Sequence, residues 1–190
     1  MRIVAALTAV AALCLVFVAS GSALDPSARG TVCAHADSTA KQATPRQLRK
    51  ALGCLINVER AKRDRRLLKP NKDLARLAQR HTKRMVTENC FRHQCEGERT
   101  LRKRIEGSGY LASGGRYGYG ENLGCSETPR GMVAVWMDNS FHRRNIVDGR
   151  FRHFGLGAKR GSPFPPGNTQ CTRRYMTYTV IFGWRKPPAN

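Results

Sequence analysis

Apolar residues recur at three- and four-residue steps in the first half of the chain and predict two amphipathic helices. The first begins at Thr44-Pro45, because threonine is a good N-cap and proline suits the first helical position. Its apolar stripe contains Leu48, Leu52, Leu55 and Ile56. The second helix follows the capping residue Asn71, and its stripe contains Leu74, Leu77, Ala78, His81 and Met85. We therefore expect His81 to be a hydrogen-bonded core residue, with ligation as the alternative.

The helical pattern is weaker in the second half of the chain. A short helix is expected over residues 98–106, and another begins at Thr128-Pro129 by the same cap and proline arrangement. The apolar face of this later helix contains Met132, Val133, Trp136 and Met137. Ser140 is expected to cap a short turn that carries His142.

Residues that favour β-structure predict strands over 154–158 and 177–182. Residues 107–120 contain six glycines and are expected to be an ordinary surface loop, with a flap that presents tyrosines to a ligand as the alternative. Because helices come first and strands later, the order of elements predicts an α+β domain in which helices cover an antiparallel sheet.

The first 23 residues have the pattern of a secretory signal peptide. Arg2 precedes an apolar run over residues 3–18, and small residues follow at positions 21–23. The run is shorter than the roughly 20 residues that span a bilayer, so a membrane anchor is the less favoured alternative. We expect cleavage after Ala23, an N-terminal arm over residues 24–43 and one domain over 44–190. The mature protein is expected to be secreted and monomeric, with no membrane span.

Six cysteines remain after the expected cleavage, and an even number in a secreted chain indicates three disulfides. Fifteen pairings are available to six cysteines. Of these we expect Cys33–Cys54, Cys90–Cys95 and Cys125–Cys171. The alternative is a zinc site formed by Cys90, His93 and Cys95, although no Cys-x-x-Cys pair supports it.

A formal net charge of +21 attracts acidic polymers in general, but we expect a solvated, arginine-rich surface, with specific binding of polyanions as the alternative. The charges are spread along the chain, and the densest run covers residues 60–66. Specific nucleic-acid binding is not expected, because no known motif for it is present. His35 and His153 are expected to have structural roles.

The chain resembles a bacterial secreted CAP domain, of the superfamily of cysteine-rich secretory, antigen 5 and pathogenesis-related 1 proteins. The segments that carry the resemblance, in order, are Leu55–Arg60, Leu74–Met85, Phe91–His93, Gly120-Glu121-Asn122, Trp136–Ile146, Phe154–Gly157 and Thr179–Gly183. No single motif is specific, but together they cover roughly residues 44–184. The resemblance implies a three-layer α-β-α sandwich with a central antiparallel sheet and a cleft.

In the family this cleft carries two histidines and two glutamates, which in several members hold a divalent metal, often zinc. The resemblance assigns the two histidines to His93 and His142 and the first glutamate to Glu121. Asn139 occupies the position of the second glutamate, with Asp138 beside it. The carboxylate pair is therefore incomplete.

Three functions are compatible with these residues. The leading one is an extracellular binding module with a divalent-metal cleft, which engages a lipid, an envelope component or a host protein, without established turnover. The alternatives are a metal-assisted hydrolase and a charge-driven binder of acidic polymers. His93, Glu121 and His142 could also form a hydrogen-bonded cluster with a purely structural role.

Overall fold

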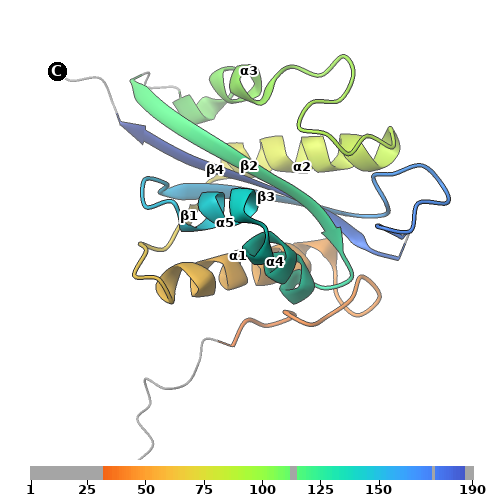
Figure 1. The fold of residues 1–190 in the computed structure, drawn as a ribbon. Coiled ribbons are helices and arrows are strands. Elements are labelled where there is room, and N and C mark those ends of the chain that lie inside the picture. Colours follow the sequence, from red (N-terminus) through yellow and green to blue (C-terminus); the bar gives the residue numbers. More distant parts are fainter. Residues whose placement is uncertain (1–31, 112–114, 173, 187–190) are drawn as a thin grey trace, which may run out of the picture. The chain divides into compact units, whose positions relative to one another are not determined.

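The computed structural model of this protein describes residues 32–111, 115–172 and 174–186 (Figure 1). The expected signal peptide lies outside these residues. A four-stranded sheet has the strand order β1-β3-β4-β2. Strand β4 (Met176–Lys186) pairs antiparallel with β2 (Arg116–Ser126) on one side and with β3 (His153–Arg160) on the other. The two-residue strand β1 (Lys69–Pro70) is parallel to β3, so the sheet is antiparallel apart from this short edge.

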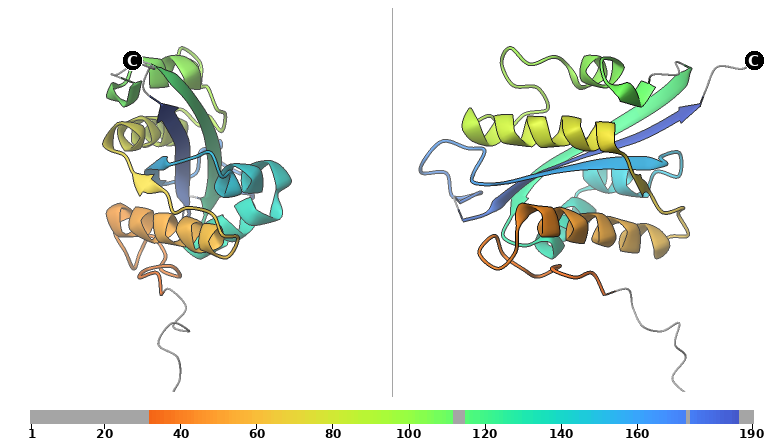
Figure 2. Two further views of the ribbon diagram at one scale, coloured as in Figure 1. Left: turned by 90° about the vertical axis from the view of Figure 1, so that its left-hand side faces the viewer. Right: turned by 180° about the vertical axis from the view of Figure 1, so that it is seen from behind.

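Helices cover both faces of the sheet. They are α1 (Pro45–Ala61), α2 (Lys72–Thr87), α3 (Leu101–Glu106), the 3₁₀ helix η2 (Gly109–Leu111), α4 (Pro129–Asp138) and α5 (Ser140–Val147). Helix α2 packs against β3 and β4, whereas α4 and α5 contact β2. The left-hand view of Figure 2 shows α2 on one side of the sheet and α5 on the other. This arrangement confirms the expected α+β class and α-β-α sandwich.

The main core lies between the sheet and helices α1 and α4. Thr44 and Gln47 form a capping box at the start of α1, and the predicted stripe of that helix is buried. Trp136 is fully buried on α4, and its indole N–H donates to the carbonyl of Leu123 at 2.8 Å. This bond satisfies the polar group of the largest core side chain and fixes α4 to β2.

Two glycines of β3 allow α2 to approach the sheet closely. A Cβ atom at Gly155 would overlap the backbone of Leu74 and Ala75, and one at Gly157 would overlap the backbone of Ala78. Helix α2 therefore packs directly on the strand backbone at these positions, which only glycine permits.

The three expected disulfides are present: Cys33–Cys54, Cys90–Cys95 and Cys125–Cys171. The alternative zinc site at Cys90 and Cys95 is therefore wrong, because sulfurs that are bonded to each other are not thiolate ligands.

In the described part of the N-terminal arm, Cys33, Ala36 and Ala40 are buried in the main core. No helix in the described ranges is both long and apolar enough to cross a membrane.

Four sequence expectations need correction. Residues 116–120, expected as a loop, are the first half of β2, because pairing with β4 supplies the hydrogen bonds that glycine-rich sequence does not predict. Helix α3 begins at Leu101, with Thr100 as its N-cap. The N-cap of α5 is Asn139, one residue before the expected Ser140. Arg60, the first residue of the densest charged run, is not part of a solvated surface but is fully buried.

Candidate functional site

His93 and Glu121 are in direct contact. His93 lies in the short loop closed by the Cys90–Cys95 disulfide, and Glu121 lies on β2. The distance between Nδ1 of His93 and Oε1 of Glu121 is 2.8 Å. The side chain of His93 is 63% exposed and that of Glu121 is 1% exposed. The contact therefore joins a buried carboxylate to an imidazole at the surface.

The third predicted residue, His142, lies on α5 and is held in place through its backbone. The side-chain amide of Asn122 donates to the carbonyl of His142 at 3.0 Å. Asn145 in turn donates to Oδ1 of Asn122 at 2.8 Å and to the carbonyl of Glu121 at 3.3 Å. The asparagine of the Gly-Glu-Asn motif thus fixes α5 to β2, a role that sequence reasoning missed although it had singled out the motif.

The two histidines have opposite electrostatic environments. The hydrogen bond to Glu121 raises the pKa of His93 above its ordinary value. The pKa of His142 is lowered, mainly by burial and then by the positive charge of His93. Nδ1 of His142 and Oε2 of Glu121 are buried and have no hydrogen-bond partner among the described residues. Nδ1 of His142 can therefore bind a ligand through its lone pair, whereas Oε2 of Glu121 lies within ion-pair distance of Arg104.

Arg104, on α3, is a further member of this site. Its side chain is 9% exposed, and Nη2 donates to the carbonyl of His93 at 2.7 Å. The same nitrogen lies 3.7 Å from Oε2 of Glu121. Nothing in the sequence separates Arg104 from the exposed Arg102 nearby, so this residue could not have been identified from the pattern alone.

Arg104 also links the site to the buried His81. Nη1 of Arg104 lies 3.4 Å from Oε1 of Glu98, whose Oε2 lies 2.9 Å from Nδ1 of His81. His81 is fully buried, which confirms the expectation of a hydrogen-bonded core histidine. Alternating acidic and basic groups therefore run from the core to the surface at His93.

Asn139, which occupies the position of the second family glutamate, has a structural role in this chain. Oδ1 of Asn139 accepts hydrogen bonds from the backbone N–H groups of Phe141 and His142, at 3.0 and 3.2 Å. Asp138 is exposed. The side chain of Asn139 thus starts the helix that carries His142, and it supplies no carboxylate.

A divalent-metal site requires several ligand atoms that converge on one point. Within the described ranges, only His81, Cys95 and Glu98 form a group of three whose ligand atoms all lie within 4.8 Å of one another. Cys95 is in a disulfide, so that group lacks a thiolate. Two of the three predicted residues, Glu121 and His142, have buried ligand atoms without a hydrogen bond, but the ligand atoms of the three residues do not all lie within 4.8 Å of one another.

Several known proteins are similar to this chain in sequence or in structure. The "Uncharacterized protein YkwD" of Bacillus subtilis is 30% identical over 105 residues, which are 54% of this chain and 39% of that protein. An outer surface protein of Borrelia burgdorferi has a similar structure, with a TM-score of 0.58, 19% identity and coverage of 72% of this chain and 92% of that chain. The chain thus spans well under half of the Bacillus subtilis relative.

A Bacillus anthracis structure, described as an extracellular protein containing an SCP domain, has a TM-score of 0.56 at 22% identity. It covers 76% of this chain and 44% of that chain. At these identities the structural likenesses show the fold. The family model for the cysteine-rich secretory protein family matches residues 55–166, a range that contains His93, Glu121 and His142. With more than half of the chain matched and the fold in agreement, this chain belongs to the cysteine-rich secretory protein family, the CAP superfamily.

Proposed function

We propose that this chain is an extracellular binding module with a divalent-metal site, zinc being the first candidate, at His93, Glu121 and His142. The observation that carries the proposal is the contact between the exposed ring of His93 and the buried carboxylate of Glu121. Two further facts support action outside the cell. Structural neighbours are described as extracellular or outer-surface proteins, and three disulfides suit an oxidising compartment.

The contact with Glu121 prepares His93 for ligation. When Nδ1–H donates to the carboxylate, the lone pair of the ring is at Nε2, and this pairing is common for metal-binding histidines. The lowered pKa of His142 favours its neutral form, which is the form that binds a metal. Glu121 has a second oxygen, Oε2, that accepts no hydrogen bond from the described residues and could complete the ligand set in place of its ion pair with Arg104. A bound divalent ion would supply Lewis acidity at the surface.

Binding is proposed in preference to hydrolysis because of Asn139. The amide oxygen of this residue caps α5, so the position that would supply a second carboxylate is committed to structure. Glu121 remains the carboxylate of the three-residue site. The partner of the module, whether a lipid, an envelope component or a host protein, belongs to the same proposal.

Calorimetric titration of zinc into the disulfide-bonded protein tests the proposal. We expect one ion per chain, with affinity lost in both His93→Ala and His142→Ala. Glu121→Gln should weaken binding by about 10- to 100-fold, as is typical when the partner of a metal-bound histidine is removed. His35→Ala is the matched control, because His35 contacts Gln47 and Ser38 outside the site. Absence of zinc binding in the parent protein, or equal affinity in all variants, would overturn the metal site.

A further inference from the structure

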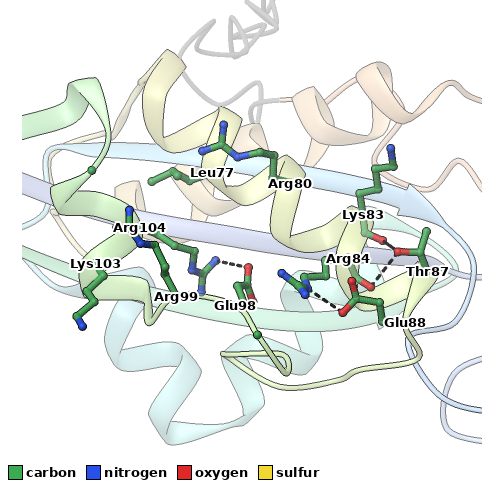
Figure 3. A pocket seen from close by; sticks show the side chains of 12 residues that line it. Leu77, Arg80, Lys83, Arg84, Thr87, Glu88, Glu98, Arg99, Lys103 and Arg104 are labelled. Carbon is green, nitrogen blue, oxygen red and sulfur yellow. Dashed lines mark hydrogen bonds and ion pairs between the residues drawn. The ribbon is translucent and has the colours of Figure 1, made fainter.

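A pocket with a volume of about 600 Å³ lies between α2 and the segment 97–107 (Figure 3). Six of its twelve lining residues are basic: Arg80, Lys83, Arg84, Arg99, Lys103 and Arg104. They come from two elements, so positive side chains line both walls. The acidic residues of the lining are Glu88 and Glu98.

Both acidic residues are already paired. Oε2 of Glu88 accepts from Nε of Arg84 at 2.7 Å, and Glu98 contacts His81 and Arg104. The basic residues Arg80, Lys83, Arg99 and Lys103 make no ion pair with any described residue. The pocket therefore has a large excess of positive charge that the protein does not neutralise.

Arg104 gives an independent indication of a ligand. Its side chain is more than nine-tenths buried, and Nη1 makes an ion pair with Glu98, yet Nε has no hydrogen-bond acceptor in the described parts of the chain. A buried guanidinium with unsatisfied donors is costly, and a ligand anion would offset that cost. Figure 3 shows the Arg104 side chain directed towards Glu98 at the pocket, between the two walls.

We infer that this pocket binds a ligand with closely spaced phosphate groups. Arginine forks bind phosphate oxygens in pairs, and lysines supply additional point charges. Four unpaired cations exceed what a single monoanion can neutralise, so a ligand with several negative charges fits better. The lining contains no aromatic side chain, which argues against a nucleic-acid strand whose bases need stacking partners.

The phosphate groups could come from a soluble oligophosphate or from the headgroup of an anionic lipid. The chemistry that the pocket recognises is the same in both cases. This inference goes beyond the proposed metal site and does not rest on it, because its test uses residues that do not contact His93, Glu121 or His142.

The test uses a double variant with one residue from each wall, Arg80→Ala with Lys103→Ala. Neither side chain makes a hydrogen bond or ion pair with a described residue. The double variant should therefore remain folded, with an unfolding free energy within about 0.5 kcal/mol of that of the parent protein. The matched control is Arg65→Ala with Arg66→Ala, which removes the same charge from an exposed turn. Comparison of the two double variants separates the contribution of the pocket to ligand affinity from the contribution of the protein's overall positive charge.

Tripolyphosphate is the soluble probe, titrated by calorimetry at about 0.15 M salt. We expect the pocket variant to raise the Kd at least about tenfold and the control to change it by less than about twofold. Equal weakening in both double variants, or no binding by the parent to tripolyphosphate or to vesicles, would overturn the inference.

Vesicles of cardiolipin, whose headgroup carries two phosphate groups, and of phosphatidylcholine separate the two sources. Binding to cardiolipin vesicles alone, weakened in the pocket variant and retained in the control, would assign a lipid headgroup. Binding to tripolyphosphate without vesicle binding, with the same dependence on the variants, would assign a soluble oligophosphate.

Discussion

The imidazole of His93 contacts the buried carboxylate of Glu121 at one edge of the site, with 2.8 Å between Nδ1 and Oε1. Glu121 is nearly inaccessible on β2, while His93 is largely exposed in a disulfide-closed loop. Arg104 approaches the other oxygen of the same carboxylate. A single buried charge is thus contacted by two basic side chains from different segments, and the behaviour of the site with pH depends on this contact.

The two site histidines should titrate separately. The pKa of His93 is raised by its bond to Glu121, and that of His142 is lowered by burial, so in NMR titration His93 should titrate at the higher pH. Glu121→Gln should move the pKa of His93 downwards, because the favourable partner of the protonated ring is removed. Titration of both rings at the same pH, or no response of His93 to Glu121→Gln, would contradict the contact.

The His93 contact should also contribute to stability in a pH-dependent way. Because the pKa of His93 is raised on folding, its contribution is present below the unfolded value and is lost as pH rises through the folded value. His93→Gln should therefore lower the free energy of unfolding more at about pH 5 than at about pH 8. Urea unfolding at the two pH values measures the difference, which should be no more than about 1 kcal/mol because His93 is exposed.

Arg60 should be among the most sensitive positions for stability. Its buried guanidinium donates to the carbonyls of Arg66, Ile146 and Asp148, at 2.8, 2.7 and 3.0 Å. Lysine cannot reproduce this fork, so Arg60→Lys should destabilise the protein by about 2–4 kcal/mol. Arg65→Lys, at an exposed position, should change the unfolding free energy by less than about 0.5 kcal/mol. If chemical denaturation gave similar changes in unfolding free energy for both variants, the hydrogen bonds of Arg60 would not be important for stability.

Removal of the N-cap of α5 should lower the free energy of unfolding by less than the loss of the Arg60 contacts. Asn139→Ala leaves the N–H groups of Phe141 and His142 without their acceptor and should cost about 1 kcal/mol. Asn139→Asp keeps an acceptor oxygen and should retain most of the stability. Thermal unfolding of the two variants checks this order, and equal losses would show that the cap is not the source of the effect.

The three disulfides should differ in the stability that they provide. In the chain-entropy model the contribution increases with the loop that is closed. The separations of 5, 21 and 46 residues for Cys90–Cys95, Cys33–Cys54 and Cys125–Cys171 correspond to about 2, 3 and 4 kcal/mol. Denaturant unfolding of variants in which both cysteines of one disulfide are replaced by serine measures the contribution of that disulfide to the free energy of unfolding. If the shortest loop contributed most, residual structure in the unfolded chain would outweigh the loop entropy.

Local signals made much of the fold predictable. The caps at Thr44 and Asn71 and the apolar stripes that follow them depend only on neighbouring residues, and both helices form as expected. Strand β2 was not predicted, because the bonds that hold its residues, including 116–120, come from β4, at least 50 residues later in the chain. Glycine has a low strand propensity, so such a segment forms a strand only through its partner.

The candidate site was predictable only in part. The resemblance selected Glu121 and His93, and the structure brings these two into contact. Arg104 and the burial of Arg60 depend on tertiary contacts with carbonyl and carboxylate groups far away in the sequence. An arginine-rich chain offers many similar residues, and periodicity does not reveal which of them fold inwards.

The direct packing of α2 on Gly155 and Gly157 restricts how this protein can diverge. Any side chain at either glycine would collide with the helix backbone, so a single mutation there requires the whole helix to shift. The arginines and lysines on the outer side of α2 face solvent and can be exchanged one at a time without that requirement. New ligand preferences can therefore arise on the outer surface of α2 while its inner surface, and the spacing of the layers, stay the same.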